Sequence, residues 1–333
     1  VLCIREPTLS EPLVTLRDTL IDAVKIRLMS DRPMGCLLSG GLDSSIITAI
    51  LVKFLGGENV RTYSIGMEGS TDLYYARKVA EALRTKHTEI LFTPEEGFAV
   101  IPKVIETLAS YDITTIRASV GMYLVSKYIS ENTDDKVIFS GEGSDELLEG
   151  YLYFHNAPTS EEGRDEALRL VQNLHMYDVL RADRCISVNG LEPRVPFLDK
   201  KFVDATLALS AEDKSPRNGF EKYVLRKAFE GYLPEEILWR RKEGFSDGVS
   251  SVKKSWYHYI QEMVEPLIEG LPEGLPSKEA MYYKTVFNNI FPSYNLDIKY
   301  WMPKWTNSTD PSGRLIKAYD LSATGSNLCN LDT

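Results

Sequence analysis

The sequence lacks the features that mark disulfide-bonded, zinc-binding or membrane-spanning proteins. Only four of its 333 residues are cysteine; they lie far apart, and none forms a Cys-x-x-Cys pair. This spacing favours reduced thiols in a cytoplasmic protein over a disulfide framework or a zinc site. No apolar run approaches the roughly 18 residues that a membrane helix needs. No signal peptide is visible, but the chain does not begin with Met, so its targeting stays open.

Basic residues are also fewer than acidic ones. The 38 lysines and arginines are outnumbered by 48 aspartates and glutamates, which gives a net charge of −10. This balance argues against non-specific nucleic-acid binding, which needs a basic face. The four histidines have no metal-ligand spacing. Apolar residues make up 43% of the chain, enough for the core of one large domain or two small ones.

Apolar periodicity predicts alternating helices and strands over the first 150 residues. Helices are predicted over 13–28, 46–54, 76–83, 98–108 and 124–128, and strands over 34–38, 60–66, 88–92 and 137–139. This alternation is typical of an α/β fold with a doubly wound parallel sheet. Beyond about residue 150 the strand signals fade, and the C-terminal half is predicted to be mostly helical. Residues 155–166 are predicted to form a surface loop, and 322–333 a frayed tail.

The segment 39–45, Ser-Gly-Gly-Leu-Asp-Ser-Ser, lies between a predicted strand and a predicted helix. Its glycines allow close approach of the backbone, and N–H groups at a helix N-terminus attract anions. Asp43 would repel a phosphate in such a cradle unless a cation lies between them. The alternative is a helix simply capped by Ser or Asp, but a cap needs one such residue, whereas this seven-residue segment has four of them together with two glycines. The segment lacks the spacing and the lysine of a Walker A loop.

A second acidic and glycine-rich segment, 140–146, reads Ser-Gly-Glu-Gly-Ser-Asp-Glu and follows the predicted strand 137–139. Both segments follow parallel strands, so both are expected at the carboxyl edge of the sheet, where ligands bind in such folds. Asp43 and Asp145 could then hold Mg²⁺ through oxygen ligands, with phosphate oxygens and water completing its shell. The alternative is that these carboxylates face solvent at a helix start, where the dipole favours them.

Three basic residues are further candidates for an anion site. Lys222 is predicted in the first turn of a helix, where a cation opposes the dipole; a role toward pyrophosphate would explain that placement. Arg117 and Arg194 carry guanidinium groups, which suit bidentate contact with phosphate or carboxylate. The alternatives are a solvated lysine and two structural arginines.

These motifs, with further segments in the same order, resemble the synthetase domain of glutamine-dependent asparagine synthetases of the animal-like type. That domain belongs to the ATP-pyrophosphatase superfamily. Segments that carry the resemblance are 37–45, 65–68, 111–115, 117–123, 140–147, 178–184, 194–199, 245–248 and 300–305. Each segment alone is a weak signal, but the ordered set is specific and spans about residues 10–318.

The resemblance implies an adenine nucleotide alpha hydrolase-like fold over 1–333, with a nucleotide-binding core at about 10–150 and a helical substrate half at about 151–320. It implies ATP and Mg²⁺ as cofactors. The implied reaction makes L-asparagine from L-aspartate through β-aspartyl-AMP, releasing AMP and pyrophosphate. Ammonia, normally from glutamine, is the nitrogen donor.

Site residues follow from the resemblance position by position. Leu37 and Ile65 resemble residues that flank the adenine, and Ser140 and Gly141 resemble the backbone that contacts the nucleoside. The pyrophosphate loop is matched by Ser39, Gly41, Asp43, Ser44 and Ser45, with Asp43 and Asp145 as Mg²⁺ ligands. Glu142 resembles the glutamate needed for the intermediate and the ammonia proton, Lys222 the pyrophosphate-side lysine, and Arg117 a site arginine.

The family's glutaminase half begins with a cysteine, whereas this chain begins Val-Leu-Cys and its first ten residues do not resemble that half. We therefore expect a glutaminase domain to be absent from this chain and to act in cis in a longer protein or in trans; use of free ammonia is the third alternative. No nucleic-acid or membrane partner is expected, and a homodimer is left open.

Two other functions are considered. A related ligase such as a β-lactam synthetase would share both loops and differ around the carboxylate pocket. A catalytically inactive regulatory homologue would have lost key site residues, whereas Asp43, Glu142, Asp145 and Lys222 are all present.

Overall fold

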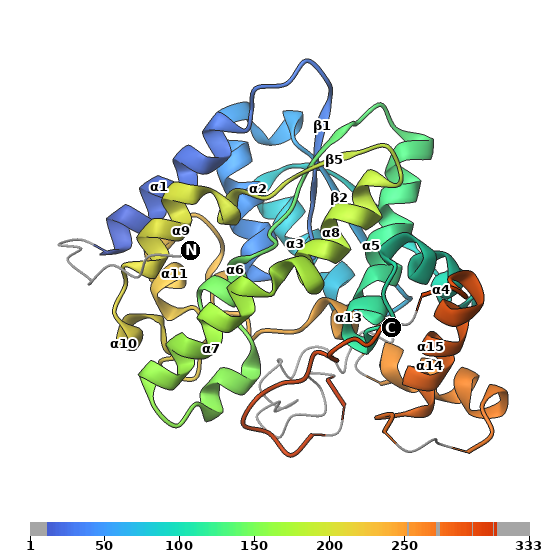
Figure 1. Ribbon diagram of the computed structural model, residues 1–333. Helices are drawn as coiled ribbons and strands as arrows, with labels where there is room; N and C mark the ends of the chain where they lie inside the picture. Colours follow the sequence, from blue (N-terminus) through green and yellow to red (C-terminus); the bar gives the residue numbers. More distant parts are fainter. Residues whose placement is uncertain (1–11, 252, 271–273, 295, 309, 312–333) are drawn as a thin grey trace.

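A five-stranded parallel sheet forms the centre of the part of the chain that the structure describes (Figure 1). The computed structural model describes residues 12–251, 253–270, 274–294, 296–308 and 310–311, so the predicted tail at 322–333 lies outside it. The strands are β1 (Met34–Leu37), β2 (Arg61–Gly66), β3 (Lys86–Leu91), β4 (Val137–Phe139) and β5 (Glu192–Arg194). Their order is β3-β2-β1-β4-β5, and every neighbouring pair is parallel.

Helices connect and cover these strands. Those of the first half are α1 (Pro12–Ile26), α2 (Leu42–Leu55), α3 (Thr71–Leu83), α4 (Pro94–Leu108), α5 (Ile113–Asn132) and α6 (Ser144–Leu147). Those that follow are α7 (Ser160–Gln172), α8 (Asp178–Ser187), α9 (Lys200–Leu207), α10 (Ala211–Lys214), α11 (Tyr223–Ala228), α12 (Glu235–Leu238), α13 (Phe245–Gly248), α14 (Trp256–Val264) and α15 (Lys278–Ile290). No helix of the described residues combines the length and hydropathy that crossing a bilayer requires.

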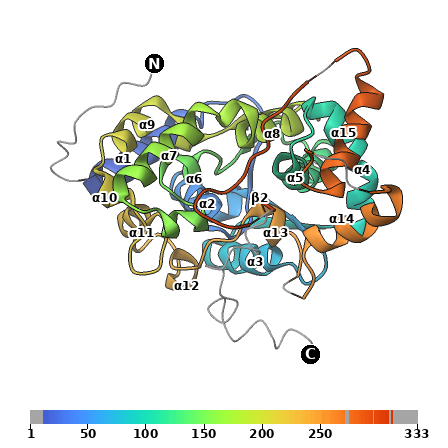
Figure 2. The same ribbon diagram turned by 60° about the horizontal axis from the view of Figure 1, so that its bottom comes forward.

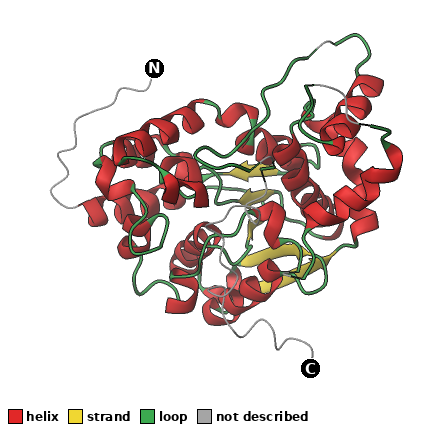
Figure 3. Cartoon of the chain, turned by 90° about the horizontal axis from the view of Figure 1, so that it is seen from below, coloured by secondary structure: helices red, strands yellow, loops and turns green. Residues whose placement is uncertain are grey.

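Both faces of the sheet are covered, as the predicted doubly wound fold requires. Side chains of β4 alternate: Val137 and Phe139 join one buried cluster, and Ile138 joins the other. The first cluster holds side chains of α1, α2, α9 and α11, and the second those of α4, α5, α14 and α15. Figures 2 and 3 show these two helical layers on opposite sides of the strands.

The topology brings the two glycine-rich segments together. β1 and β4 are direct neighbours, with Met34 opposite Val137 and Cys36 opposite Phe139. Helix α2, which leads from β1 toward β2, packs in the first cluster, whereas α8, which precedes β5, packs in the second. Such a switch point opens a crevice at the carboxyl edge of a parallel sheet. The predicted adjacency of segments 39–45 and 140–146 is confirmed.

In the second half one prediction is wrong and one strand was not predicted. Residues 155–166 do not form a surface loop throughout, because α7 begins at Ser160. Thr159 caps this helix by accepting a hydrogen bond from the Glu162 backbone N–H, and two glutamates in the first turn complement its dipole. Strand β5 was missed because it is only three residues long and contains Pro193, which a strand tolerates at a sheet edge.

Candidate active site

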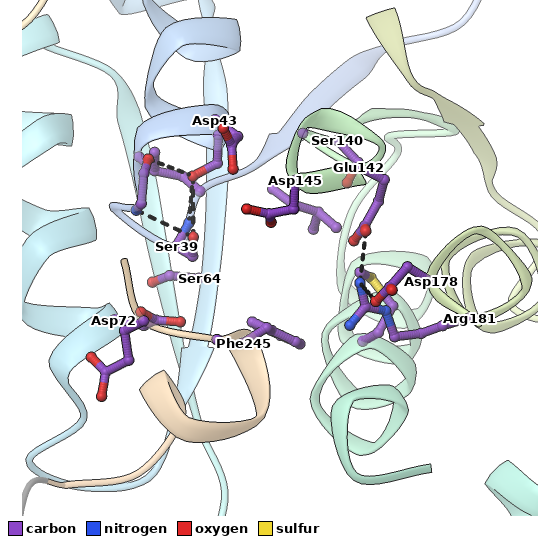
Figure 4. Close-up of a pocket in the computed structure, with 18 of the residues that line it drawn as sticks. Ser39, Asp43, Ser64, Asp72, Ser140, Glu142, Asp145, Asp178, Arg181 and Phe245 are labelled. Atoms are coloured by element: carbon purple, nitrogen blue, oxygen red, sulfur yellow. Dashed lines mark hydrogen bonds and ion pairs between the residues drawn. The ribbon is translucent and has the colours of Figure 1, made fainter. Parts of the chain in front are cut away.

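A pocket lies at the carboxyl edge of the sheet, between the ends of the strands and helices from the second half (Figure 4). Ser39 and Asp43 lie on one side of it, Glu142, Asp178 and Arg181 lie on the other, and Asp145 lies between them. The predicted site residues that line it are Leu37, Ser39, Gly41, Asp43, Ser44, Ile65, Ser140, Gly141, Glu142 and Asp145. Lys222 lines a smaller pocket that shares Gly41 and Asp43 with the first.

The first loop is shaped by its glycines and serines. Gly41, and not Ser or Asp, is the N-cap of α2, and it makes no side-chain cap bond, so the simple capping alternative is not what the structure has. Gly40 has a φ of +70°, and a Cβ there would lie 2.4 Å from the backbone of α3. Ser39 bonds Ser44 across the turn, Oγ to Oγ, at 3.2 Å. Ser45 is fully buried, and its hydroxyl does not line the pocket.

The second loop packs closely on the first. A Cβ at Gly141 would lie 3.0 Å from the Asp43 Cβ and the Ser44 backbone nitrogen, so a larger residue would separate the loops. The Ser144 hydroxyl donates a 2.8 Å hydrogen bond to Asp43 Oδ1. This close approach places the carboxylates of Asp43 and Asp145 beside each other.

Lys222 joins the two aspartates. Its Nζ lies 2.6 Å from Asp43 Oδ2 and 2.7 Å from Asp145 Oδ1. The residue has a left-handed backbone, immediately precedes α11 and is only 2% exposed, so it is not the solvated lysine of the alternative hypothesis. Gly150 gives it room, since a Cβ there would lie 2.0 Å from the Lys222 Cε.

A second lysine, Lys242, was missed by the sequence analysis. Its Nζ lies 2.6 Å from Asp145 Oδ2 and 3.9 Å from Asp43 Oδ2. Burial opposes its charge, but the two aspartates outweigh burial and raise the pKa of Lys242 above its usual range. Burial likewise opposes ionisation of Asp145, but Lys222 and Lys242 outweigh it and lower the pKa of Asp145 below its usual range. The basic run at 240–242, just before the family-like segment 245–248, was the available signal.

The donor set fits a Mg²⁺ ion shared between protein and nucleotide. Carboxylate oxygens of Asp43 and Asp145 lie within 2.7 Å of one Lys222 nitrogen, so a small cation near that position could reach both. Among the described residues no group of three or more His, Cys, Asp or Glu could hold a metal alone. Magnesium is commonly held by one or two carboxylates plus substrate phosphates and water, which matches this arrangement.

Glu142 lies on the opposite wall, paired with an arginine. Arg181 Nη2 lies 2.6 Å from Glu142 Oε2 and 3.0 Å from Asp178 Oδ1. Burial raises the pKa of Glu142, and the charge of Arg181 opposes that rise. Tyr151 completes the wall: its hydroxyl lies 3.0 Å from Asp178 Oδ2 and 2.6 Å from Glu146 Oε1. In the sequence, only the family-like segments 140–147 and 178–184 pointed toward Glu146, Asp178 and Arg181, and no signal pointed toward Tyr151.

The structure does not bring Arg117 into the pocket. Its guanidinium is buried elsewhere, where it donates to Glu279 Oε1 and to both carboxylate oxygens of Asp310, each at 2.7 Å. The ring of Tyr257 lies 4.8 Å from its guanidinium carbon. Arg194 is also structural, since it donates to the backbone oxygen of Met29 at 2.9 Å.

The comparisons with known proteins agree with the resemblance. The family model of asparagine synthase matches residues 15–170 and 158–307. The asparagine synthetase (glutamine-hydrolyzing) of Gallus gallus is 50% identical over 315 residues, which cover 90% of this chain and 56% of that protein. The Homo sapiens protein of the same name is 51% identical over 321 residues, which cover 91% of this chain and 57% of that protein.

A solved structure, NMN synthetase from Francisella tularensis, is 14% identical, covers 87% of this chain and 97% of that chain, and has a TM-score of 0.35, too low to support an argument. The chain spans a little more than half the length of the curated relatives that it matches. Because the family model matches most of the chain and the relatives are about half identical to it, the chain belongs to the asparagine synthase family.

Proposed function

We propose that this chain catalyses the ATP-dependent synthesis of L-asparagine from L-aspartate, through β-aspartyl-AMP and with release of AMP and pyrophosphate. The observation that supports this most directly is one pocket that combines a glycine-rich anion loop, a charged cluster of Asp43, Asp145 and Lys222, and Glu142 on the facing wall. The names of the curated relatives point to the same reaction.

The nucleotide would lie along the carboxyl edge of the sheet. Leu37 and Ile65 supply apolar surface for the adenine, beside Ser140 and Gly141 for the nucleoside. The phosphates would meet the N-terminus of α2, where backbone N–H groups and the helix dipole attract anions. Mg²⁺ bound by the two aspartates would neutralise charge that builds on the phosphates. Ser45 would act only indirectly, through its backbone N–H, which donates to the Gly41 carbonyl oxygen at 3.1 Å, since its hydroxyl is buried outside the pocket.

Aspartate's side-chain carboxylate is a poor electrophile at neutral pH. Attack of its oxygen on the α-phosphorus converts that oxygen into part of an AMP leaving group and expels pyrophosphate. Negative charge grows on the departing pyrophosphate, so Lys222 and Lys242 are well placed to stabilise the transition state more than the ground state.

Glu142 is proposed to help position the aspartyl carboxylate for formation of the intermediate and then to act as the base of the second half-reaction. Ammonia attacks the activated carbonyl, and the resulting ammonium must lose a proton before asparagine forms and AMP leaves. The raised pKa of Glu142 suits a group that accepts this proton, and Arg181 holds the carboxylate in place at 2.6 Å. Arg117 lies outside the pocket, so any role for it in this reaction would be indirect.

Glutamine is proposed as the physiological source of the ammonia. The relatives named as glutamine-hydrolyzing are longer than this chain, and a glutaminase domain in cis or in trans would supply the nitrogen. A cytoplasmic location is part of the same proposal.

The test supplies the purified chain with MgATP, aspartate and excess ammonium, and follows pyrophosphate and asparagine together. Equal amounts of both products, with pyrophosphate release that depends on aspartate, are expected. Pyrophosphate without asparagine would favour another amide-forming ligase. A folded protein that binds ATP but releases no pyrophosphate would favour the inactive homologue.

A further inference from the structure

Two lysines from separate parts of the chain contact the carboxylates of Asp43 and Asp145. Lys222 lies at the N-terminus of α11, and Lys242 lies in the segment that follows α12. Both ammonium groups lie within 2.7 Å of Asp145 oxygens. Neither segment belongs to the sheet, so something else must fix their relative position.

One buried arginine, Arg226, bonds the backbone of both segments. Its Nε donates to the Glu221 backbone oxygen at 2.8 Å, directly before Lys222. Its Nη1 donates to the backbone oxygens of Leu238 at 2.5 Å and Arg240 at 2.8 Å, which precede Lys242. The side chain is 2% exposed, and its guanidinium carbon lies 5.3 Å from the ring centre of Phe220.

The planar guanidinium makes this arrangement specific. Its donors point in fixed directions, so one group can hold three carbonyl oxygens from two segments at set distances, which an ammonium on a flexible stem does not reproduce. Arg226 does not line the main pocket, but it lines the smaller one beside Asp43 and both lysines.

We propose that Arg226 is a positioning residue that fixes Lys222 and Lys242 together for stabilisation of the departing pyrophosphate. The proposal rests on the proposed function. Displacement of a charged group by about 1 Å is enough to lower a rate on the order of 100-fold. A residue that merely caps α12 would instead affect stability and leave the turnover of folded enzyme unchanged.

The experiment is a double-mutant cycle of Arg226→Met with Lys242→Met. Turnover of aspartate-dependent pyrophosphate release, the KM for ATP and the KM for aspartate are measured for each protein, with thermal unfolding as the check on folding. Arg27→Met is the matched control, because Arg27 also joins two segments through a backbone oxygen and a carboxylate, Ala23 and Asp199, outside both pockets.

Arg226→Met should lower kcat about 100-fold with little change in the KM for aspartate, whereas Arg27→Met should keep wild-type turnover. When Lys242→Met is already present, adding Arg226→Met should lower kcat by less than about tenfold, since the effects of residues that act as a unit are not additive. Full additivity, or normal turnover of folded Arg226→Met, would overturn the proposal. If Arg226→Met does not fold, Arg226→Lys takes its place in the cycle, because it keeps the positive charge and removes the planar guanidinium.

Binding of magnesium pyrophosphate, measured by calorimetry, separates this proposal from the proposed function. We expect Arg226→Met to weaken that binding by at least about tenfold, even if the chain proves to catalyse another pyrophosphate-releasing reaction. Unchanged affinity of the folded variant for magnesium pyrophosphate would show that Arg226 does not position Lys222 and Lys242. Loss of binding without any asparagine formation by the wild type would support the positioning role and overturn the proposed function.

Discussion

Replacement of Glu142 by Gln separates a structural role from a catalytic one. The variant keeps the shape of the side chain and removes its charge and basicity. In the structure Glu142 is 15% exposed in its side chain, bonds Arg181 at 2.6 Å and faces the anion loop across the pocket. A glutamine there can still accept one hydrogen bond from the arginine, so the wall should keep its form.

The two expected magnitudes differ enough to be told apart. Loss of the charge-assisted bond should cost about 1–3 kcal/mol of unfolding free energy, because Arg181 keeps its second carboxylate, Asp178, at 3.0 Å. Loss of a general base should lower turnover on the order of 10²–10⁴-fold. Affinity for ATP should change little, since Glu142 does not belong to the predicted phosphate or adenine contacts.

The assay supplies excess ammonium, so a missing glutaminase domain cannot limit the rate. Asparagine yield reports the whole reaction, and transfer of ¹⁸O from labelled aspartate to AMP reports that the intermediate forms and that its acyl carbon–oxygen bond is then cleaved by ammonia or water. The matched control is Glu166→Gln on α7. That glutamate is fully buried and pairs with Arg169 at 2.6 Å, but it does not line the pocket.

We expect Glu142→Gln to lose both asparagine formation and ¹⁸O transfer, while Glu166→Gln loses stability and keeps the turnover of each folded molecule. Normal ¹⁸O transfer with no asparagine would restrict Glu142 to the ammonia step. Wild-type values for both measurements would refute the catalytic role and leave the charged cluster on the other wall to carry the reaction.

Three further predictions follow from buried groups near and away from the pocket. Gly150→Ala should destabilise the protein by about 1–3 kcal/mol in urea and lower turnover, because the added Cβ would lie 2.0 Å from the lysine that binds both aspartates; wild-type stability would contradict that contact. Burial alone would raise the pKa of Glu221, but its hydrogen bond with His155 and the nearby arginine outweigh burial and lower it. The Glu221 carboxylate therefore stabilises the protein above about pH 4.3, and this stabilisation is lost as the pH falls through the native pKa. Glu221→Gln should lower the free energy of unfolding most near pH 7 and least below about pH 4 in denaturation curves. A loss of unfolding free energy that stays constant with pH would count against this. Burial raises the pKa of Cys36 and Cys185 to about 12, so peptide mapping after thiol labelling at pH 8 should find both unmodified in native protein and modified after unfolding, and rapid native labelling of either would disprove its burial.

Local signals sufficed for the nucleotide side of the site. Segments 39–45 and 140–146 each follow a strand, and parallel strands place such segments at one edge by geometry alone. The sequence therefore predicted the adjacency of Asp43 and Asp145 without knowledge of any contact. Their shared edge was predictable because every strand of a parallel sheet ends there, whereas the direct pairing of β1 with β4 is seen only in the structure.

The opposite wall depends on partners that are distant in sequence. Arg117 and Arg181 both lie on helices, and nothing local tells which one faces the pocket. Arg117 meets its carboxylate partners 162 and 193 residues further along the chain, whereas Arg181 meets Glu142 39 residues earlier. Tertiary packing of the second half decides between them, and single-sequence periodicity does not contain that information.

The lysine cluster shows how a local electrostatic argument can be correct and incomplete. A carboxylate in a phosphate cradle requires a cation, and the sequence analysis inferred only a metal ion from that requirement. In the structure Lys222 and Lys242 already balance the charges of Asp43 and Asp145, two positive against two negative. In the proposed reaction, a nucleotide that arrives with its own magnesium would bring a cation for the two aspartates, and both ammonium groups would then be free to contact the phosphates. If the proposed function is right, the two aspartates would then hold the magnesium and the two lysines would stabilise the departing pyrophosphate. A buried arginine that holds both lysine segments would serve the protein before and after the nucleotide binds.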